Sequence, residues 1–102
     1  MDLEIKKDLT SNWFKMLQES ICHSIDSLES SHIKFESTNW KRSLKKDEGG
    51  GEFRILKNGK IFDKVGVNFS KVYGKFPKQF QKSIPGTKKD PKFWASGISV
   101  VM

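Results

Sequence analysis

Apolar residues recur at three- and four-residue spacing in the first third of the chain. The series comprises Trp13, Leu17, Ile21, Ile25 and Leu28, with Phe14 and Met16 beside it. This period is typical of one face of an amphipathic helix, so we predict a helix from about Thr10 to Ile33. Whether residues 3–9 extend it is left open by the pattern. Thr10 or Ser11 can serve as the N-cap through its hydroxyl. We expect the helix to fray near residues 30–31, because serine competes with the backbone for hydrogen bonds.

Two apolar runs farther along the chain flank a short polar turn. The runs are residues 53–56 and 61–73, and Asn58-Gly59 lies between them. Asn-Gly is the preferred pair for a type I′ turn, so we predict an antiparallel hairpin. A two-residue turn would place Arg54 opposite Asp63. We interpret these two charges as a structural ion pair that fixes the register.

The remaining segments read as connections and a last strand. Residues 34–48 read as a connector and residues 75–91 as a lysine-rich loop. Gly49-Gly50-Gly51 is either a flexible hinge or a backbone that passes close to a neighbour. Residues 93–102 predict a third strand. The predicted fold class is therefore α+β, with an N-terminal helix followed by antiparallel strands.

The chain ends inside an apolar, β-branched run, residues 98–102. Domains tend to end on frayed polar residues. We therefore expect sequence beyond Met102, with this chain as the front portion of a longer protein.

Composition limits the class of protein. The chain has 102 residues, of which 35% are hydrophobic and 30% charged, as in a small soluble domain. No apolar run reaches the roughly 20 residues that span a bilayer, and the N-terminus lacks the apolar core of a signal peptide. Cys22 is the only cysteine, which excludes an internal disulfide. These features favour a cytoplasmic location.

The net charge of +7 favours an anionic partner or simply a solvated lysine-rich surface. The lysines are spread along the chain, which favours the second reading. An alternative function is a small basic module that binds single-stranded nucleic acid through lysines and aromatic residues such as Phe53 and Phe69.

Most familiar motifs are missing from the sequence. The three glycines precede a strand, whereas a P-loop follows one. Cys22, His23 and His32 lack metal-ligand spacing, so we expect ordinary structural roles for them.

Asn68 and Ser70 share one strand face, which is polar because it lines a cavity or because it meets water. Ser99 lies in an apolar run, where its hydroxyl bonds either a backbone carbonyl or a ligand.

Three segments of the chain, residues 49–56, 59–74 and 93–101, resemble the N-terminal third of oxygen-dependent coproporphyrinogen III oxidases. Residues 17–22 and 35–42 also fit. The most specific stretch is Lys64-Val65-Gly66-Val67-Asn68-Phe69-Ser70. The resemblance implies that residues 1–102 are the N-terminal part of a single oxidase domain. It also implies a fold with a large antiparallel sheet flanked by helices.

The resemblance implies an oxidoreductase of haem biosynthesis. Such an enzyme oxidatively decarboxylates two propionates of coproporphyrinogen III to the vinyl groups of protoporphyrinogen IX. Molecular oxygen is the oxidant, without flavin or haem, and a divalent metal is described for bacterial members. The resemblance further implies a homodimer with no nucleic-acid partner and no membrane span.

Among the residues present, the resemblance assigns substrate contact to Ser99. The family's histidine would follow directly after Met102, and the other catalytic and metal-associated residues lie farther on. We therefore expect no catalytic residue and no metal ligand in this chain, and an inactive fragment. The sequence departs mildly from the family, with Asp63 for glutamate, Phe53 for serine and Glu52 for a small residue.

Overall fold

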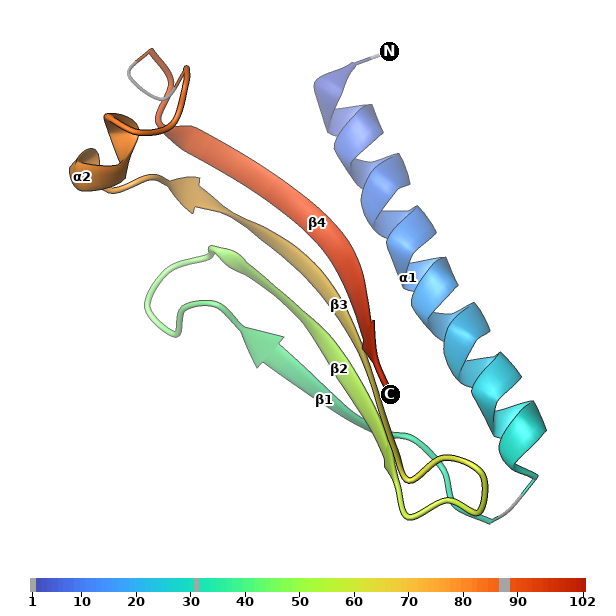
Figure 1. Ribbon diagram of the computed structural model, residues 1–102. Helices are drawn as coiled ribbons and strands as arrows, with labels where there is room; N and C mark the ends of the chain where they lie inside the picture. The colour runs from blue at the N-terminus through green and yellow to red at the C-terminus, as the bar shows by residue number, and fades with distance from the viewer. Residues whose placement is uncertain (1, 31, 87–88) are drawn as a thin grey trace.

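The computed structural model describes residues 2–30, 32–86 and 89–102. A long helix precedes a four-stranded antiparallel sheet in the order β1-β2-β3-β4 (Figure 1). The elements are α1 (Leu3–Glu29), β1 (Glu36–Lys41), β2 (Gly49–Lys57), β3 (Lys64–Lys75), α2 (Lys78–Gln81) and β4 (Lys92–Val101). This architecture confirms the predicted α+β class.

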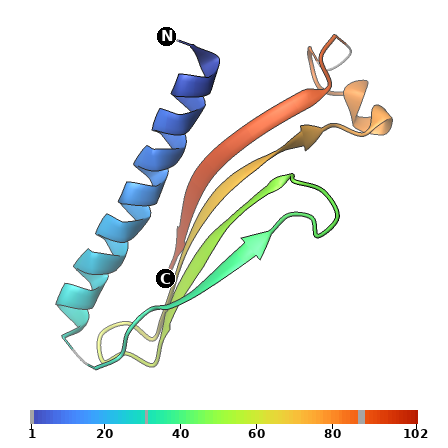
Figure 2. The ribbon, with the colours of Figure 1, turned by 180° about the vertical axis from the view of Figure 1, so that it is seen from behind.

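Helix α1 packs on one face of the sheet, over β3 and β4. Figures 1 and 2 show α1 along one side of the bent strands, with the termini of the chain on that side. The core between helix and sheet comprises Cys22, Ile25, Leu56, Val65 and Val67. Burial of these apolar side chains provides the main favourable energy of this small domain.

The helix begins earlier than predicted. Asp2 is its N-cap, and its Oδ1 accepts a hydrogen bond of 3.0 Å from the Glu4 N–H. The predicted cap at Thr10 or Ser11 is therefore wrong, because Asp2 satisfies the first amides and the helix runs through residues 3–9. The helix ends at Glu29, next to the predicted fraying near residues 30–31, and Ser30 adopts a left-handed conformation with φ of 53°. The predicted bound at Ile33 is therefore four residues too far. Ser31 lies outside the described residues.

The buried face of α1 differs from the predicted apolar stripe. Trp13 and Met16 are 61% and 65% exposed, whereas Gln18 and Glu29 are buried. Of the predicted stripe, Ile25 is buried in the core and Ile21 packs against it. The buried polar side chains reach backbone groups of the sheet: Gln18 Nε2 donates to the carbonyl oxygens of Glu52 and Val67, at 2.8 and 3.2 Å. Because of these contacts, the face that α1 turns toward the sheet is not its most apolar face.

The β2–β3 hairpin is real, but its predicted register is wrong. Leu56 pairs with Val65 and Arg54 with Val67, so Arg54 does not lie opposite Asp63. The connection is the six-residue loop 58–63. It closes through bonds from Asn58 N–H to the Asp63 carbonyl, at 2.8 Å, and from Gly59 N–H to the Phe62 carbonyl, at 2.9 Å.

Strand β1 lies inside the predicted connector, and α2 lies inside the predicted loop. Strand β4 confirms the predicted third strand within one residue at each end.

The three glycines belong to β2 and are not a hinge. A Cβ on Gly49, Gly50 or Gly51 would lie 1.9–2.1 Å from a carbonyl oxygen of a neighbouring strand. The alternative of a close backbone approach is therefore the correct one.

Candidate functional site

The two faces of the sheet differ in what covers them. Val65, Val67 and Phe69 on β3 are buried beneath α1. Because side chains alternate along a strand, Gly66, Asn68 and Ser70 lie on the opposite side. We call this side, which α1 does not cover, the open face.

Ser99 lies on the open face. It pairs directly with Asn68, which in turn pairs with Phe53 on β2. Ser99 is exposed, and its hydroxyl has no hydrogen-bond partner among the described residues. The sequence left two partners open for this hydroxyl, a backbone carbonyl or a ligand. The bond to a backbone carbonyl is not observed, so the hydroxyl is available to a ligand on the open face.

Two aromatic rings pack on glycines of the open face. A Cβ on Gly51 would lie 2.8 Å from Cζ2 of Trp40, and a Cβ on Gly66 would lie 3.3 Å from Cζ of Phe53. Gly66 pairs in register with Ile55, and the Phe53 ring lies close to its backbone. The result is a flat platform of glycine and aromatic surface beside the polar side chains.

One side-chain hydrogen bond crosses this platform. Trp40 Nε1 on β1 donates to Asn68 Oδ1 on β3 at 3.0 Å, across the intervening glycine of β2. Sequence reasoning missed this contact because it treated residues 34–48 as a connector. The face shared by Asn68 and Ser70 was the one signal that pointed to it.

A cation lies toward the far end of the platform. The Arg42 guanidinium stacks 4.7 Å above the Phe93 ring, and its Nη1 donates to the Tyr73 carbonyl at 2.9 Å. Arg42 also forms an ion pair of 3.1 Å with Glu48. These contacts hold the guanidinium above Gly74, where a Cβ would lie 2.9 Å from Nη1.

The charges around Arg54 lie on the helix side of the sheet. Arg54 forms ion pairs with Glu19 on α1, at 2.6 Å, and with Glu52, at 2.7 Å. The Arg54 hydrogen bond holds the pKa of Glu52 below its usual value, and Ser37 adds a second hydrogen bond of 2.5 Å. Arg54 therefore ties β2 to α1, a structural role with partners other than the predicted Asp63.

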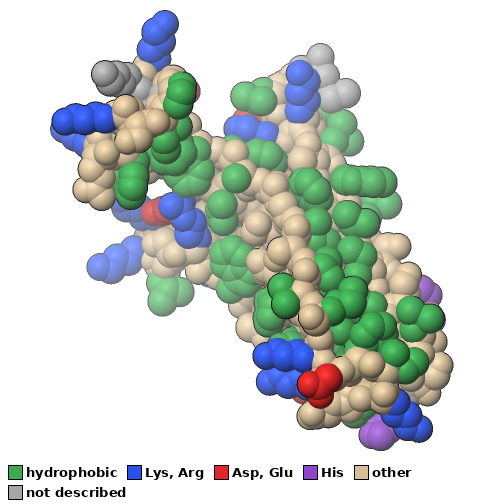
Figure 3. Space-filling model, viewed as in Figure 1, with side chains coloured by type: hydrophobic (Ala, Val, Ile, Leu, Met, Phe, Trp, Pro, Cys, Tyr) green, Lys and Arg blue, Asp and Glu red, His purple; other side chains and the backbone are tan. Residues whose placement is uncertain are grey.

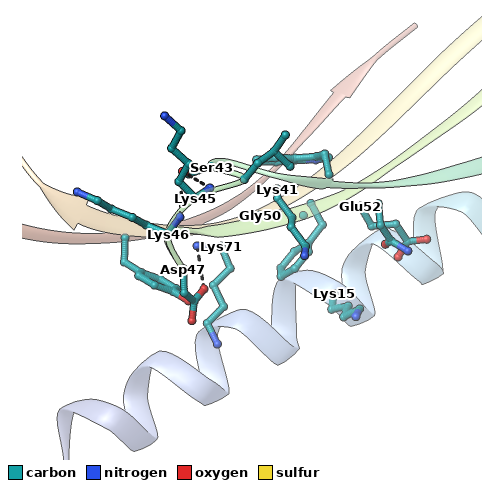
Figure 4. Close-up of a pocket in the computed structure, with 16 residues that line it drawn as sticks. Lys15, Lys41, Ser43, Lys45, Lys46, Asp47, Gly50, Glu52 and Lys71 are labelled. Carbon is teal, nitrogen blue, oxygen red and sulfur yellow. Dashed lines mark hydrogen bonds between the residues drawn. The ribbon is translucent and has the colours of Figure 1, made fainter.

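A lysine-rich pocket of about 640 Å³ opens between α1 and the β1–β2 end of the sheet (Figure 4). Its lysines are Lys15, Lys41, Lys45, Lys46 and Lys71. The Tyr73 hydroxyl donates to Asp47, which lowers the pKa of Asp47 and raises that of Tyr73. Ser99 does not line this pocket, which opens on the helix side of the sheet.

The described residues contain neither a cluster of metal-ligand side chains nor a helix that could span a membrane. Across residues 2–30, 32–86 and 89–102, no group of three or more His, Cys, Asp or Glu side chains could hold a metal. Cys22 is buried, which raises its thiol pKa, whereas His23 and His32 are exposed. In the same residues, no helix has the length and apolar character needed to cross a membrane.

The structure thus defines an α+β protein with a helix-covered antiparallel sheet and a polar site on its open face. A family described as "Coproporphyrinogen III oxidase" matches residues 9–102, and the chain belongs to that family.

Curated relatives carry the name "Oxygen-dependent coproporphyrinogen-III oxidase". One from Rickettsia akari (strain Hartford) is 40% identical over 103 residues, covering 93% of this chain and 36% of the relative. One from Rickettsia bellii (strain RML369-C) is 39% identical over the same shares. One from Rickettsia africae (strain ESF-5) is 38% identical over 99% of this chain and 37% of the relative. The chain therefore spans about a third of the length of these relatives.

Proposed function

We propose that the protein acts in the oxygen-dependent oxidative decarboxylation of coproporphyrinogen III. The observation that carries the proposal is the family match over residues 9–102. The names of the relatives support it. Coproporphyrinogen III is the proposed substrate and molecular oxygen the proposed co-substrate. No comparison supports the alternative of a nucleic-acid-binding module.

The proposed reaction balances as two successive two-electron oxidations. Each propionate side chain loses CO₂ from its carboxyl carbon and one hydrogen from its β-carbon, so that a vinyl group remains. The electron pair and two protons pass to O₂, which is reduced to hydrogen peroxide. Two such steps on neighbouring rings give protoporphyrinogen IX.

Within this chain, we propose the open face as part of the substrate site, with Ser99 in contact with substrate. Three properties support this placement: the hydroxyl is exposed, Asn68 lies beside it, and a flat glycine and aromatic surface adjoins it. A ligand with four carboxylates also suits a chain of net charge +7.

We propose that residues 1–102 form the N-terminal part of a single oxidase domain. We also propose a cytoplasmic homodimer, and a divalent metal with ligands outside this chain. Family membership supports these points.

The test is turnover by the protein expressed from its complete gene. Coproporphyrinogen III is supplied under air, and formation of protoporphyrin is followed by fluorescence together with oxygen uptake. We expect turnover that stops when oxygen is removed. Absence of oxygen-dependent turnover in well-folded protein would contradict the proposed function.

A second arm uses residues 1–102 alone. We expect no turnover from them, because the proposed catalytic groups lie outside this chain. Measurable turnover by this isolated segment would overturn the division of roles between residues 1–102 and the remainder.

A further inference from the structure

We propose that Asn68 is a substrate-contacting residue that, together with Ser99, receives one carboxylate of the tetrapyrrole. This inference rests on the proposed function and names a contact within the same site. Three structural observations carry it: the orientation of the Asn68 amide, the support of that orientation by Trp40, and the register between Asn68 and Ser99.

The orientation of the Asn68 amide follows from its partner. Trp40 Nε1 lies 3.0 Å from Asn68 Oδ1. An indole N–H can only donate, so it must face the oxygen of the amide and not its NH₂ group. The Asn68 Nδ2 therefore points away from Trp40. Among the described residues this NH₂ group has no hydrogen-bond partner.

Trp40 is itself held in place. Its ring lies against Gly51, where any side chain would collide with Cζ2. Trp40 also pairs with Gly51 in the β1–β2 register, so the backbone and the ring are positioned by the same neighbour. A half-buried ring with little freedom gives the Asn68 amide a defined direction before a ligand arrives, which lowers the cost of binding.

The Asn68 NH₂ group and the Ser99 hydroxyl belong to directly opposed residues on β3 and β4. Opposed residues in antiparallel strands have Cβ atoms about 4.5–5.5 Å apart and point to the same side. Two donors at that separation suit the two oxygens of a single carboxylate, which is an acceptor only. Phe53, Asn68 and Ser99 lie side by side across β2, β3 and β4. Phe53 is apolar, so Asn68 and Ser99 form the polar end of this row.

The chemistry favours a carboxylate over a pyrrole nitrogen. The free side of Asn68 offers N–H donors, and a pyrrole N–H is also a donor, so the two cannot pair. A propionate oxygen accepts from both Asn68 and Ser99. The Trp40–Asn68 hydrogen bond therefore determines which part of the tetrapyrrole can lie at this point of the sheet.

The test measures binding of coproporphyrin III, the stable oxidised form of the proposed substrate, to the protein expressed from its complete gene. The variants are Asn68→Asp, which places a negative charge at the donor position, and Asn68→Ala, which removes the donor without adding charge. Loss of a hydrogen bond to a charged group predicts a rise in Kd of at least about tenfold. Coproporphyrin III tetramethyl ester, which lacks carboxylates, is titrated in parallel.

A carboxylate contact predicts that both variants lose much more affinity for the free acid than for the tetramethyl ester, whose neutral ester carbonyls are weaker acceptors. A structural role would weaken both ligands alike, and that result would overturn the assignment. Trp40→Phe should raise the Kd for the free acid by a few-fold, because the amide can then rotate. Asn39→Asp, the same change at an exposed position on the face of β1 opposite to Trp40, is the matched control and should leave both affinities unchanged.

The two proposals fail in different ways. If the wild-type protein neither binds coproporphyrin III nor turns over coproporphyrinogen III, the proposed function falls and this assignment with it. If the wild type binds the free acid and the Asn68 variants bind it equally well, the assignment falls alone. Circular dichroism of each variant verifies that the folded state is retained.

Discussion

At the scale of single residues, the glycines of β2 show how closely the strands approach. The Gly51 α-carbon has no room for a methyl group, because a Cβ would lie 1.9 Å from the Phe69 carbonyl oxygen and 2.8 Å from Trp40. Gly97 on β4 is different, since the nearest atom to its Cβ position is Ser70 Oγ at 4.0 Å. The two glycines therefore form a matched pair for mutation.

We expect Gly51→Ala to lower the free energy of unfolding by about 1–3 kcal/mol through overpacking. Gly97→Ala should change it by no more than about 0.5 kcal/mol. Urea unfolding of the two variants measures both values. Equal stability of the two alanine variants would show that the strands adjust without cost.

Glu52 is the residue from which a pH effect is expected. Its folded-state pKa lies below the ordinary value of 4.5, mainly because of the hydrogen bond from Arg54. A depressed pKa stabilises the folded protein above the unfolded-state value, and this stabilisation is lost as the pH falls through the folded-state value.

The Tm of the wild type should therefore fall more steeply than that of Glu52→Gln as the pH is lowered from about 5 to about 3. Glu36→Gln, at an exposed position of β1, is the control and should retain the wild-type slope. Parallel curves for the wild type and Glu52→Gln would contradict the expectation.

At the scale of elements, Glu29 connects the end of α1 to the β2–β3 loop. The residue is 2% exposed, and its carboxylate accepts hydrogen bonds from the backbone N–H groups of Lys60, Ile61 and Phe62. Three converging amides form a site for an anion, and this side chain occupies it. We call this set of hydrogen bonds between Glu29 and residues 60–62 the Glu29 clasp. It explains why the β2–β3 connection is a loop of six residues and not a tight turn.

Glu29→Gln replaces the charged acceptor with a neutral amide that also carries donors. We expect the free energy of unfolding to fall by about 1.5–3 kcal/mol, the range for hydrogen bonds to charged groups. Glu4→Gln in the exposed first turn should cost no more than about 0.5 kcal/mol. Denaturant unfolding distinguishes the two, and a Glu29→Gln variant as stable as Glu4→Gln would mean that the clasp is not stabilising.

At the scale of the whole molecule, the outward side of α1 is apolar. Ile5, Leu9, Trp13 and Met16 follow helical spacing and are 49–65% exposed. Figure 3 shows hydrophobic side chains gathered on the helix side of the molecule. Exposed apolar surface of this kind favours association with other protein surfaces.

We expect residues 1–102 in isolation to self-associate through this surface and through the edges of the sheet. Leu9→Lys combined with Met16→Glu should shift the population toward monomer in sedimentation velocity at several concentrations. Ser20→Lys combined with Ser24→Glu introduces the same charges at exposed polar positions and should have little effect. A monodisperse wild-type monomer that unfolds cooperatively would contradict this expectation.

The sequence by itself determined the kinds of element and the family. Helical spacing predicted α1, and two apolar runs predicted part of β2 and most of β3. The segment around Gly66 carried the family resemblance. These features depend on neighbours within a few residues, which is why local pattern reveals them. Strand β1 escaped detection because its exposed, polar residues show no apolar alternation.

Only the tertiary structure decided which surfaces meet. Gln18 and Glu29 are polar yet buried, because each finds backbone partners that exist only once the sheet has formed. Asn58 keeps the positive φ that a turn requires, at 60°, but the Glu29 clasp and the loop's own hydrogen bonds prevail over the tight Asn-Gly turn. The contact of Asn68 with Trp40, and its place beside Ser99, likewise join residues 28 or more positions apart in the sequence, a separation across which no local pattern carries information.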